Sequence, residues 1–172
     1  LGFVPGSPIG NLSESGAQSL LDHCHEVLGD EAAFLIGVDL DKSPEVLIPA
    51  YDDPEGVTAE SNRNLLKRIN HELGLAIDVQ AFAHEARYLT DPARIEMHLV
   101  ALTDQTLAIA GQTYTLAAGE SFHTETSHKY TIKSFSQLAK QAGWQLHCNI
   151  INDVGKIQLS RELRRWIRAR QN

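Results

Sequence analysis

The chain has 172 residues, 42% of them hydrophobic, and its formal charge at pH 7 is −7. A chain of this size can bury a core of its own, as one domain or as two compact lobes. The negative charge argues against nonspecific nucleic-acid binding, because a phosphate-binding surface normally has a basic excess. No apolar run reaches the roughly eighteen residues that span a membrane. With only Cys24 and Cys148, no disulfide framework is indicated, so we expect a cytoplasmic protein.

The first thirty residues predict a strand followed by a helix. Residues 1–4 are apolar and precede Pro5 and Gly6, which is typical of a buried parallel strand that ends in a turn. Ser15 and Gln18 have the spacing of a capping box that begins the helix. Its predicted apolar stripe consists of Ala17, Leu20, Leu21, Cys24, Val27 and Leu28, and Gly29 ends it.

Residues 32–38 are continuously apolar, as expected of a strand that is covered on both faces. Strand, helix and strand in this order predict a βαβ unit, and therefore part of a doubly wound α/β sheet. Ligands of such sheets bind beyond the carboxyl ends of the strands. The turn that contains Gly6, Gly10 and Asn11 is therefore a candidate binding site, although a plain turn followed by a helix cap would have the same pattern.

The composition changes after about residue 42. Pro44, Pro49 and Pro54 predict a loop. A polar helix is predicted to begin at Thr58, with the apolar stripe Leu65, Leu66, Ile69 and Leu73, and Val79, Phe82 and Ala83 indicate a short helix after it.

The second part of this region predicts strands. Residues 94–100 alternate, with Ile95, Met97 and Leu99 on one face, which indicates a half-buried antiparallel strand. Residues 107–116, with a turn at Gly111, predict a hairpin. We expect a small α+β lobe over residues 43–129.

Residues 119–130 are almost entirely polar and predict a loop between a strand and a helix, of the kind that binds ligands. A helix is expected from residue 132 to Gly143, and strands at 144–150 and from 157, joined by a turn at 152–155. The arginine-rich residues 161–170 are expected to form a solvated helix end.

The histidines do not predict a metal site. His23 and His25 are two residues apart and would point to different faces of a helix. His123 and His128 flank Glu125, which is a weaker candidate. Ser7 is not a hydrolase nucleophile, because the surrounding turn lacks Gly-x-Ser-x-Gly spacing and Pro8 has no backbone N–H for an oxyanion.

Four blocks in order, residues 3–11, 48–58, 94–100 and 119–130, resemble the histidine Nα-methyltransferase family of ergothioneine biosynthesis. The resemblance extends from Phe3 to about Trp144 and corresponds to the C-terminal half of the family chain. It implies a class I, Rossmann-like methyltransferase sheet formed by residues 1–42 and 130–172, with residues 43–129 inserted as a substrate-recognition lobe. The implied cofactor is S-adenosyl-L-methionine (SAM), the implied substrate is L-histidine, and the implied full-length enzyme is a monomer.

The resemblance also implies the substrate contacts. Asn11 would bind the amino and carboxylate end of histidine, with the turn at Gly6 alongside, and Tyr51 would bind the carboxylate. Glu125 and Ser127 would hydrogen-bond the imidazole ring, and Met97 would line the ring pocket. These roles suit the groups, because an imidazole offers one N–H to a carboxylate and one acceptor nitrogen to a hydroxyl. Asn11 and Tyr51 are expected to orient the substrate, and no residue is assigned as a catalytic base.

Three features depart from the family pattern. Pro8 and His128 replace residues that are usual in the family, and no glycine-rich cofactor turn precedes Gly6. We therefore expect the chain to be part of a longer enzyme and to lack most of that enzyme's cofactor site. Two alternatives remain: a non-catalytic amino-acid-binding fragment, and a methyltransferase for a related aromatic amino acid. Indole is disfavoured, since it has no second ring nitrogen for Ser127.

Overall fold

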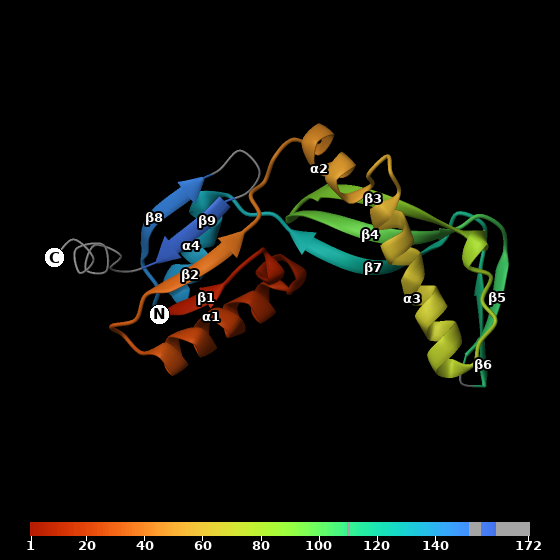
Figure 1. Ribbon diagram of the computed structural model, residues 1–172, viewed down its shortest axis with the longest axis horizontal. Coiled ribbons are helices and arrows are strands. Elements are labelled where there is room, and N and C mark those ends of the chain that lie inside the picture. Colours follow the sequence, from red (N-terminus) through yellow and green to blue (C-terminus); the bar gives the residue numbers. More distant parts are fainter. Residues whose placement is uncertain (110, 152–155, 161–172) are drawn as a thin grey trace. The chain divides into compact units, whose positions relative to one another are not determined.

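The computed structural model describes residues 1–109, 111–151 and 156–160 (Figure 1). The turn expected at 152–155 and the arginine-rich segment 161–170 lie outside the described residues. The chain divides into two compact units, one formed by Leu1–Asp41 and Ser127–Asn172 and the other by Lys42–Thr126. Both contain helices and strands, so the protein is mixed α/β. Among the described residues, no helix is both long and apolar enough to span a membrane.

The first unit contains a four-stranded sheet. Its strands lie in the order β1 (Gly2–Val4), β2 (Phe34–Val38), β9 (Lys156–Ser160) and β8 (Leu146–Ile151). β1 and β2 are parallel, as the strand–helix–strand pattern predicted, whereas β9 is antiparallel to both of its neighbours. The expectation that the first strand is buried was wrong. β1 ends the described sheet, and Phe3 is 60% exposed.

Helix α1 (Glu14–Leu28) begins at a different cap from the predicted one. Ser13 is the N-cap, and its side chain accepts a hydrogen bond from the Gly16 N–H, so the capping box at Ser15 was wrong. Gly29 ends the helix at a φ of 79°, as predicted. Val27 was wrongly included in the apolar stripe, because it is 68% exposed.

The core of the first unit lies between the sheet and the helices α1 and α4 (Ile132–Gln141). Its buried side chains are Ile9, Ala17, Leu21, Phe34, Ile36, Val38, Phe135, Leu138, Ala139, Ala142 and Trp144. The Trp144 ring lies 5.1 Å from that of Phe34, and its indole N–H donates to the Leu21 carbonyl oxygen at 2.9 Å. Thr131 and Ser134 cap α4 reciprocally, which fixes where the chain turns from β7 into this helix.

The second unit contains a three-stranded sheet in the order β3 (Phe82–Thr90), β4 (Ala93–Ala101) and β7 (Ser121–His128). The last two residues of β7 belong to the first unit. β4 was predicted. β3 was not, and the short helix expected at Phe82 and Ala83 was wrong: only Val79–Ala81 is a 3₁₀ helix, η2. β3 pairs with β4 over its whole length, from Phe82 opposite Ala101 to Thr90 opposite Ala93. This hairpin pairing stabilises as a strand a segment that has few β-branched residues.

The polar segment predicted as a loop is strand β7. Phe122 packs against the apolar core of this unit, whereas Ser121 and His123 contact the polar side chain of His98. Only part of the strand is therefore apolar. The loop prediction was wrong because side chains that face a polar sheet surface can be polar, and the sequence of the strand then shows no alternation of apolar and polar residues.

Two helices of the second unit pack on its sheet. α2 (Pro44–Tyr51) replaces the loop that three prolines had predicted. Pro44 occupies the first turn, where the missing N–H is tolerated, and buried Leu47 packs with Ala86 and Ile95 of the sheet. α3 (Val57–Leu73) was predicted one residue short, and its stripe is narrower than expected because Leu73 is exposed.

A two-stranded hairpin completes the second unit. Its strands are β5 (Gln105–Ile109) and β6 (Gln112–Leu116), with the turn at Gly111, where φ is 78°. This hairpin was predicted, although β5 begins two residues earlier. Its buried Leu107 packs with Leu66 of α3.

The start of α3 predicts a pH dependence of stability. Asp53 accepts hydrogen bonds from the backbone N–H groups of Val57 and Thr58, each at 2.8 Å. A hydrogen bond from the Thr58 side chain, followed by these two, lowers the pKa of the Asp53 carboxyl from 3.8 to about 2. Because the folded-state pKa is depressed, the stabilisation is complete above about pH 4 and is lost as the pH falls toward 2.

We therefore expect Asp53→Asn to lower the melting temperature at pH 6, and the difference from the unmodified chain to narrow steadily below pH 4. Thermal unfolding followed by circular dichroism at several pH values measures this. Asp52→Asn is the control, since it removes an equal charge but none of these hydrogen bonds. A difference that stays constant down to about pH 2 would contradict the assignment.

Candidate functional site

The turn after β1 packs tightly against β2. Gly6 has a φ of 72° and leads into η1 (Pro8–Asn11), a 3₁₀ helix. The Ser7 hydroxyl oxygen accepts a hydrogen bond from the Asp39 N–H at 2.8 Å, just beyond β2. A Cβ on Gly37 would collide with the Gly6 carbonyl oxygen, so only glycine in β2 leaves room for this turn. The turn is thus fixed by two contacts with the same strand.

The other end of this turn lies against the end of β7. A Cβ placed on buried Gly10 would be 3.0 Å from the His128 carbonyl oxygen and 3.5 Å from Ser127 Oγ. Asn11, the next residue, is exposed. The structure therefore brings the turn that carries Gly6 and Asn11 beside Ser127, which is far from it in sequence, within the first unit.

A buried lysine lies beside Ser127. The side chain of Lys129 is fully buried, and its ammonium lies 2.6 Å from an Asp39 carboxylate oxygen and donates to Ser127 Oγ at 2.8 Å. The sequence analysis did not assign Lys129 or Asp39. The only sequence signal was their position, Asp39 directly after a predicted strand and Lys129 within the polar segment.

In the second unit, Tyr51 is held through its main chain. Its carbonyl oxygen lies 2.7 Å from His84 Nε2, which must therefore carry the proton, because a carbonyl can only accept. His84 Nδ1 is then the acceptor for the buried Asn62 amide, at 2.9 Å. Asn62 also donates to the His98 carbonyl oxygen, so α3 and two strands together fix the last residue of α2. Neither His84 nor Asn62 was predicted.

Met97 and Glu125 lie on neighbouring strands of the same sheet. Met97 is opposite Ala86 in β3, and its carbonyl oxygen accepts a hydrogen bond from the Thr124 hydroxyl at 2.9 Å. Thr124 directly precedes Glu125, which is exposed. Tyr51 packs against the cluster that contains Ala86. The second unit therefore carries all three of these predicted residues: Tyr51 is on α2, Met97 is on β4 and Glu125 is on β7.

One face of this sheet carries a charged network. Glu96 accepts hydrogen bonds from Arg94 at 2.7 Å and lies 3.2 Å from His98 Nε2. Burial opposes its ionisation, but these two partners outweigh burial and lower the pKa of Glu96. Burial also lowers the pKa of His98, whose ring stacks on His123 at 5.1 Å. Across the described parts of the chain, no group of three or more histidine, cysteine or acidic side chains could hold a metal ion.

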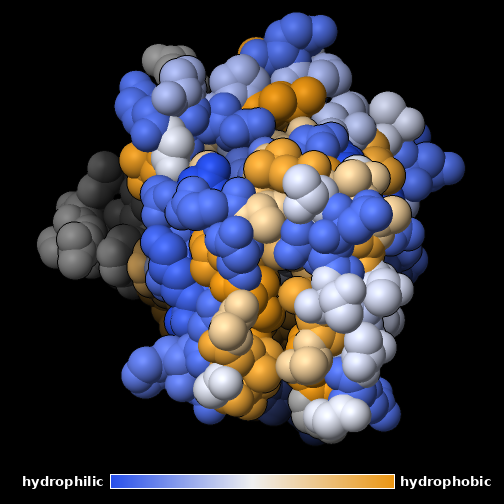
Figure 2. Space-filling model, turned by 90° about the vertical axis from the view of Figure 1, so that its right-hand side faces the viewer, coloured by the Kyte–Doolittle hydropathy of each residue, from blue (hydrophilic) through white to orange (hydrophobic). Residues whose placement is uncertain are grey.

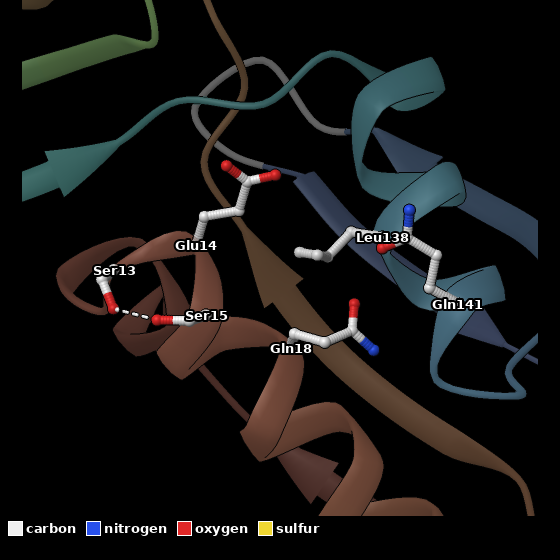
Figure 3. A pocket seen from close by; sticks show the side chains of 6 residues that line it. All are labelled: Ser13, Glu14, Ser15, Gln18, Leu138 and Gln141. Atoms are coloured by element: carbon white, nitrogen blue, oxygen red, sulfur yellow. Dashed lines mark hydrogen bonds between the residues drawn. The ribbon is translucent and has the colours of Figure 1, made fainter.

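Two pockets lie away from the predicted site residues. One, of about 530 Å³, lies between α1 and α4 and is lined by Ser13, Glu14, Ser15, Gln18, Leu138 and Gln141 (Figure 3). The other, of about 220 Å³, is apolar and lies between α3 and the sheet and hairpin of the second unit, with Leu66, Leu99 and Phe122 in its lining. Figure 2, in which the right-hand side of Figure 1 faces the viewer, shows apolar side chains at the surface between polar ones.

A family model described as histidine-specific methyltransferase, SAM-dependent, matches residues 1–160. The chain belongs to this family. The match includes every residue that the sequence analysis proposed for the substrate site, and it extends through both units. S-adenosylmethionine is accordingly the cofactor expected in this histidine-specific methyltransferase family.

Curated relatives agree with this family. The chain is 39% identical over 140 residues to a histidine N-alpha-methyltransferase of Mycolicibacterium smegmatis, a match that covers 80% of this chain and 44% of that protein. It is 42% identical over 127 residues to the histidine N-alpha-methyltransferase of Mycobacterium tuberculosis, covering 73% and 40%. Ergothioneine biosynthesis protein 1 of Neurospora crassa is 39% identical over 69 residues, which is 40% of this chain and 8% of that protein. The chain spans less than half the length of these relatives.

The two pockets do not fit the cofactor of the histidine-specific methyltransferases. SAM carries a carboxylate, an ammonium, a sulfonium and an adenosine. The pocket between α1 and α4 offers one charged group, the Glu14 carboxylate, and one apolar side chain, Leu138. It therefore has no cation for the cofactor carboxylate. The apolar pocket beside α3 has no charged side chain in its lining. Neither of these two pockets is therefore suited to the family's cofactor.

Proposed function

We propose that this chain takes part in SAM-dependent methylation of the α-amine of L-histidine, repeated to the trimethylated betaine. The observation that carries the proposal is the contact between the Gly6–Asn11 turn and Ser127, because it joins two blocks of the family pattern at the carboxyl end of β1. The family match and the names of the relatives support the same chemistry.

The sheet of the first unit supports a class I methyltransferase domain. Its parallel pair β1 and β2 is followed by an antiparallel β9 inserted next to β8, and an antiparallel pair after a helix is how such sheets often finish. We propose residues 43–129 as the substrate-recognition lobe of this domain, because they carry Tyr51, Met97, Glu125 and Ser127.

The proposed roles follow from the chemistry of each side chain. The Asn11 amide and the Tyr51 hydroxyl can donate to the substrate carboxylate and orient the α-amine. The Glu125 carboxylate accepts the ring N–H, the Ser127 hydroxyl donates to the other ring nitrogen, and Met97 contacts the ring. SAM supplies the electrophilic methyl group. No strong base is required, because an α-amine with a pKa of about 8 is partly unprotonated near neutrality.

Most of the rate advantage is therefore expected to come from position and orientation. The hydrogen bonds that hold Tyr51 and the Gly6 turn in place are therefore part of the proposed mechanism. They fix the residues that would orient the amine toward the methyl donor.

Calorimetric titration of the full chain with L-histidine, L-tryptophan and SAM tests the proposal. We expect histidine to bind and tryptophan to bind at least about tenfold more weakly, since indole leaves one ring partner unsatisfied. Products heavier by one, two and three methyl groups in mass spectrometry, after incubation with histidine and SAM, would show that the chain also holds the cofactor. Absence of histidine binding would refute the proposal.

A second candidate is an amino-acid-binding lobe without catalysis. The observation that favours it is the poor fit of the described pockets to SAM. Histidine binding without SAM binding or methyl transfer is the result that would select this candidate.

A further inference from the structure

Lys129 is a buried cation that the proposed reaction does not use. Its side chain is fully buried, whereas that of its partner Asp39 is 21% exposed. The flanking main chain fixes its position: the Tyr130 N–H donates to the Asp39 carbonyl oxygen at 3.1 Å, and the Asp41 N–H donates to the Tyr130 carbonyl oxygen at 2.9 Å. These two bonds hold the main chain that follows Lys129 beside the end of β2.

Stability alone does not explain this arrangement. Removing a lysine and a carboxylate from water carries a desolvation penalty, and replacing buried ion pairs with apolar residues is often neutral or stabilising. The ion pair is therefore weak evidence of a structural role, and what distinguishes it is its third member. Ser127, itself 6% exposed, lies 2.8 Å from the ammonium.

The chemistry of the two groups fixes the direction of this hydrogen bond. An ammonium has three donors and no acceptor, so the Ser127 oxygen must accept. The hydroxyl hydrogen must then point to a different group. Gly10 closes one side of the hydroxyl, since its Cβ position is 3.5 Å from Oγ. Lys129 thus limits the rotation of the Ser127 hydroxyl and leaves it a donor.

We propose that Lys129, held by Asp39, is a positioning residue that makes Ser127 a hydrogen-bond donor and so selects a substrate ring with an unprotonated nitrogen. This inference rests on the proposed function, in which Ser127 contacts the imidazole of histidine. A ring with a C–H at that place offers no acceptor to the Ser127 hydroxyl, so the hydrogen bond to the ring would be lost.

The test compares two neutral double variants of the full chain. Asp39→Asn/Lys129→Gln keeps an N–H that can donate to Ser127, and Asp39→Asn/Lys129→Met removes it. Neither leaves an unpaired buried charge. Each is titrated at about pH 8, where free imidazole is neutral, with L-histidine and with 3-(pyrrol-2-yl)-L-alanine. The pyrrole keeps a ring N–H but has a C–H in place of the accepting nitrogen.

The quantity measured is the ratio of the two dissociation constants. We expect the Gln double variant to keep the ratio of the unmodified chain within about threefold, and the Met double variant to lower it by about tenfold or more, because the hydroxyl can then turn to another acceptor. When Ser127→Ala is added to both double variants, the one with Gln and the one with Met at position 129 should have the same ratio. This last result separates positioning through Ser127 from a general effect on folding.

An unchanged ratio in the Met double variant would overturn the inference while leaving the proposed function intact, because histidine would still bind selectively. Failure of the unmodified chain to bind histidine would instead refute both. The single variant Asp39→Asn keeps the Lys129 donor and should keep the ratio, so it provides a second test if the Met variant does not fold. A ratio that collapses in Asp39→Asn would also overturn the inference.

Discussion

Replacing Glu125 with alanine is expected to weaken L-histidine binding by about 10- to 150-fold. The estimate corresponds to the loss of one hydrogen bond to a charged group, about 1.5–3 kcal/mol. Glu125 is the carboxylate proposed to accept the ring N–H of the substrate, and it lies beside Thr124, whose hydroxyl is bonded to the Met97 main chain. Calorimetric titration with histidine measures the change, and binding of SAM should change far less.

Glu55→Ala is a suitable control for Glu125→Ala. Glu55 is exposed and belongs to the same unit, so its removal changes the net charge equally. We expect histidine affinity within about twofold of the unmodified chain for this variant. Equal losses of histidine and SAM binding in Glu125→Ala would count against its assignment to the imidazole.

Gly37→Ala is expected to destabilise the chain and to weaken histidine binding together. Gly37 is buried in β2, and the added methyl group would meet the Gly6 carbonyl oxygen. Overpacking of this kind costs about 1–3 kcal/mol, or roughly 2–12 °C in melting temperature for a chain of this size. Because the turn must move to relieve the collision, Asn11 would move with it, and we expect at least a tenfold loss of histidine affinity, on the order of 1.4 kcal/mol.

Leu35→Ala separates these two effects. Leu35 is the adjacent residue of β2 and is only partly buried, so its truncation should lower the melting temperature without displacing the Gly6 turn. Thermal unfolding and titration of both variants give the comparison. If Leu35→Ala lowered histidine affinity as much as Gly37→Ala, lost stability rather than the turn would be the cause.

The sequence predicted the elements whose apolar residues recur at a regular period. α3, β4 and the β5–β6 hairpin are of this kind, because each has a face that packs on a core, and β2 was predicted from its continuous apolar run. β3 and β7 were missed for the opposite reason. β3 is stabilised by pairing with β4, and β7 places polar side chains such as Ser121 against His98. Hydrophobic periodicity reports burial, and it carries little information where a strand surface is polar.

The candidate site was predictable only where residues carry a recognisable chemistry. The resemblance supplied Asn11, Tyr51 and Glu125, but it did not supply the groups that hold them. Lys129 and His84 look ordinary in sequence because their importance comes from partners at long sequence separation, Asp39 and Tyr51. The requirement for glycine at position 37 also comes from a distant part of the chain, because the Gly6 turn lies too close to leave room for a side chain. Such requirements are set by tertiary contacts, which no local pattern records.

Glu125 and Ser127 belong to one strand, with a single residue between them. Residues two apart in an antiparallel strand have Cα atoms about 7 Å apart. Peptide geometry sets that interval, whatever the rest of the protein does. A molecule bound by both side chains would therefore have two anchor points whose main-chain spacing is set by the strand itself, and only the lengths and rotamers of the two side chains would remain to adapt to its size.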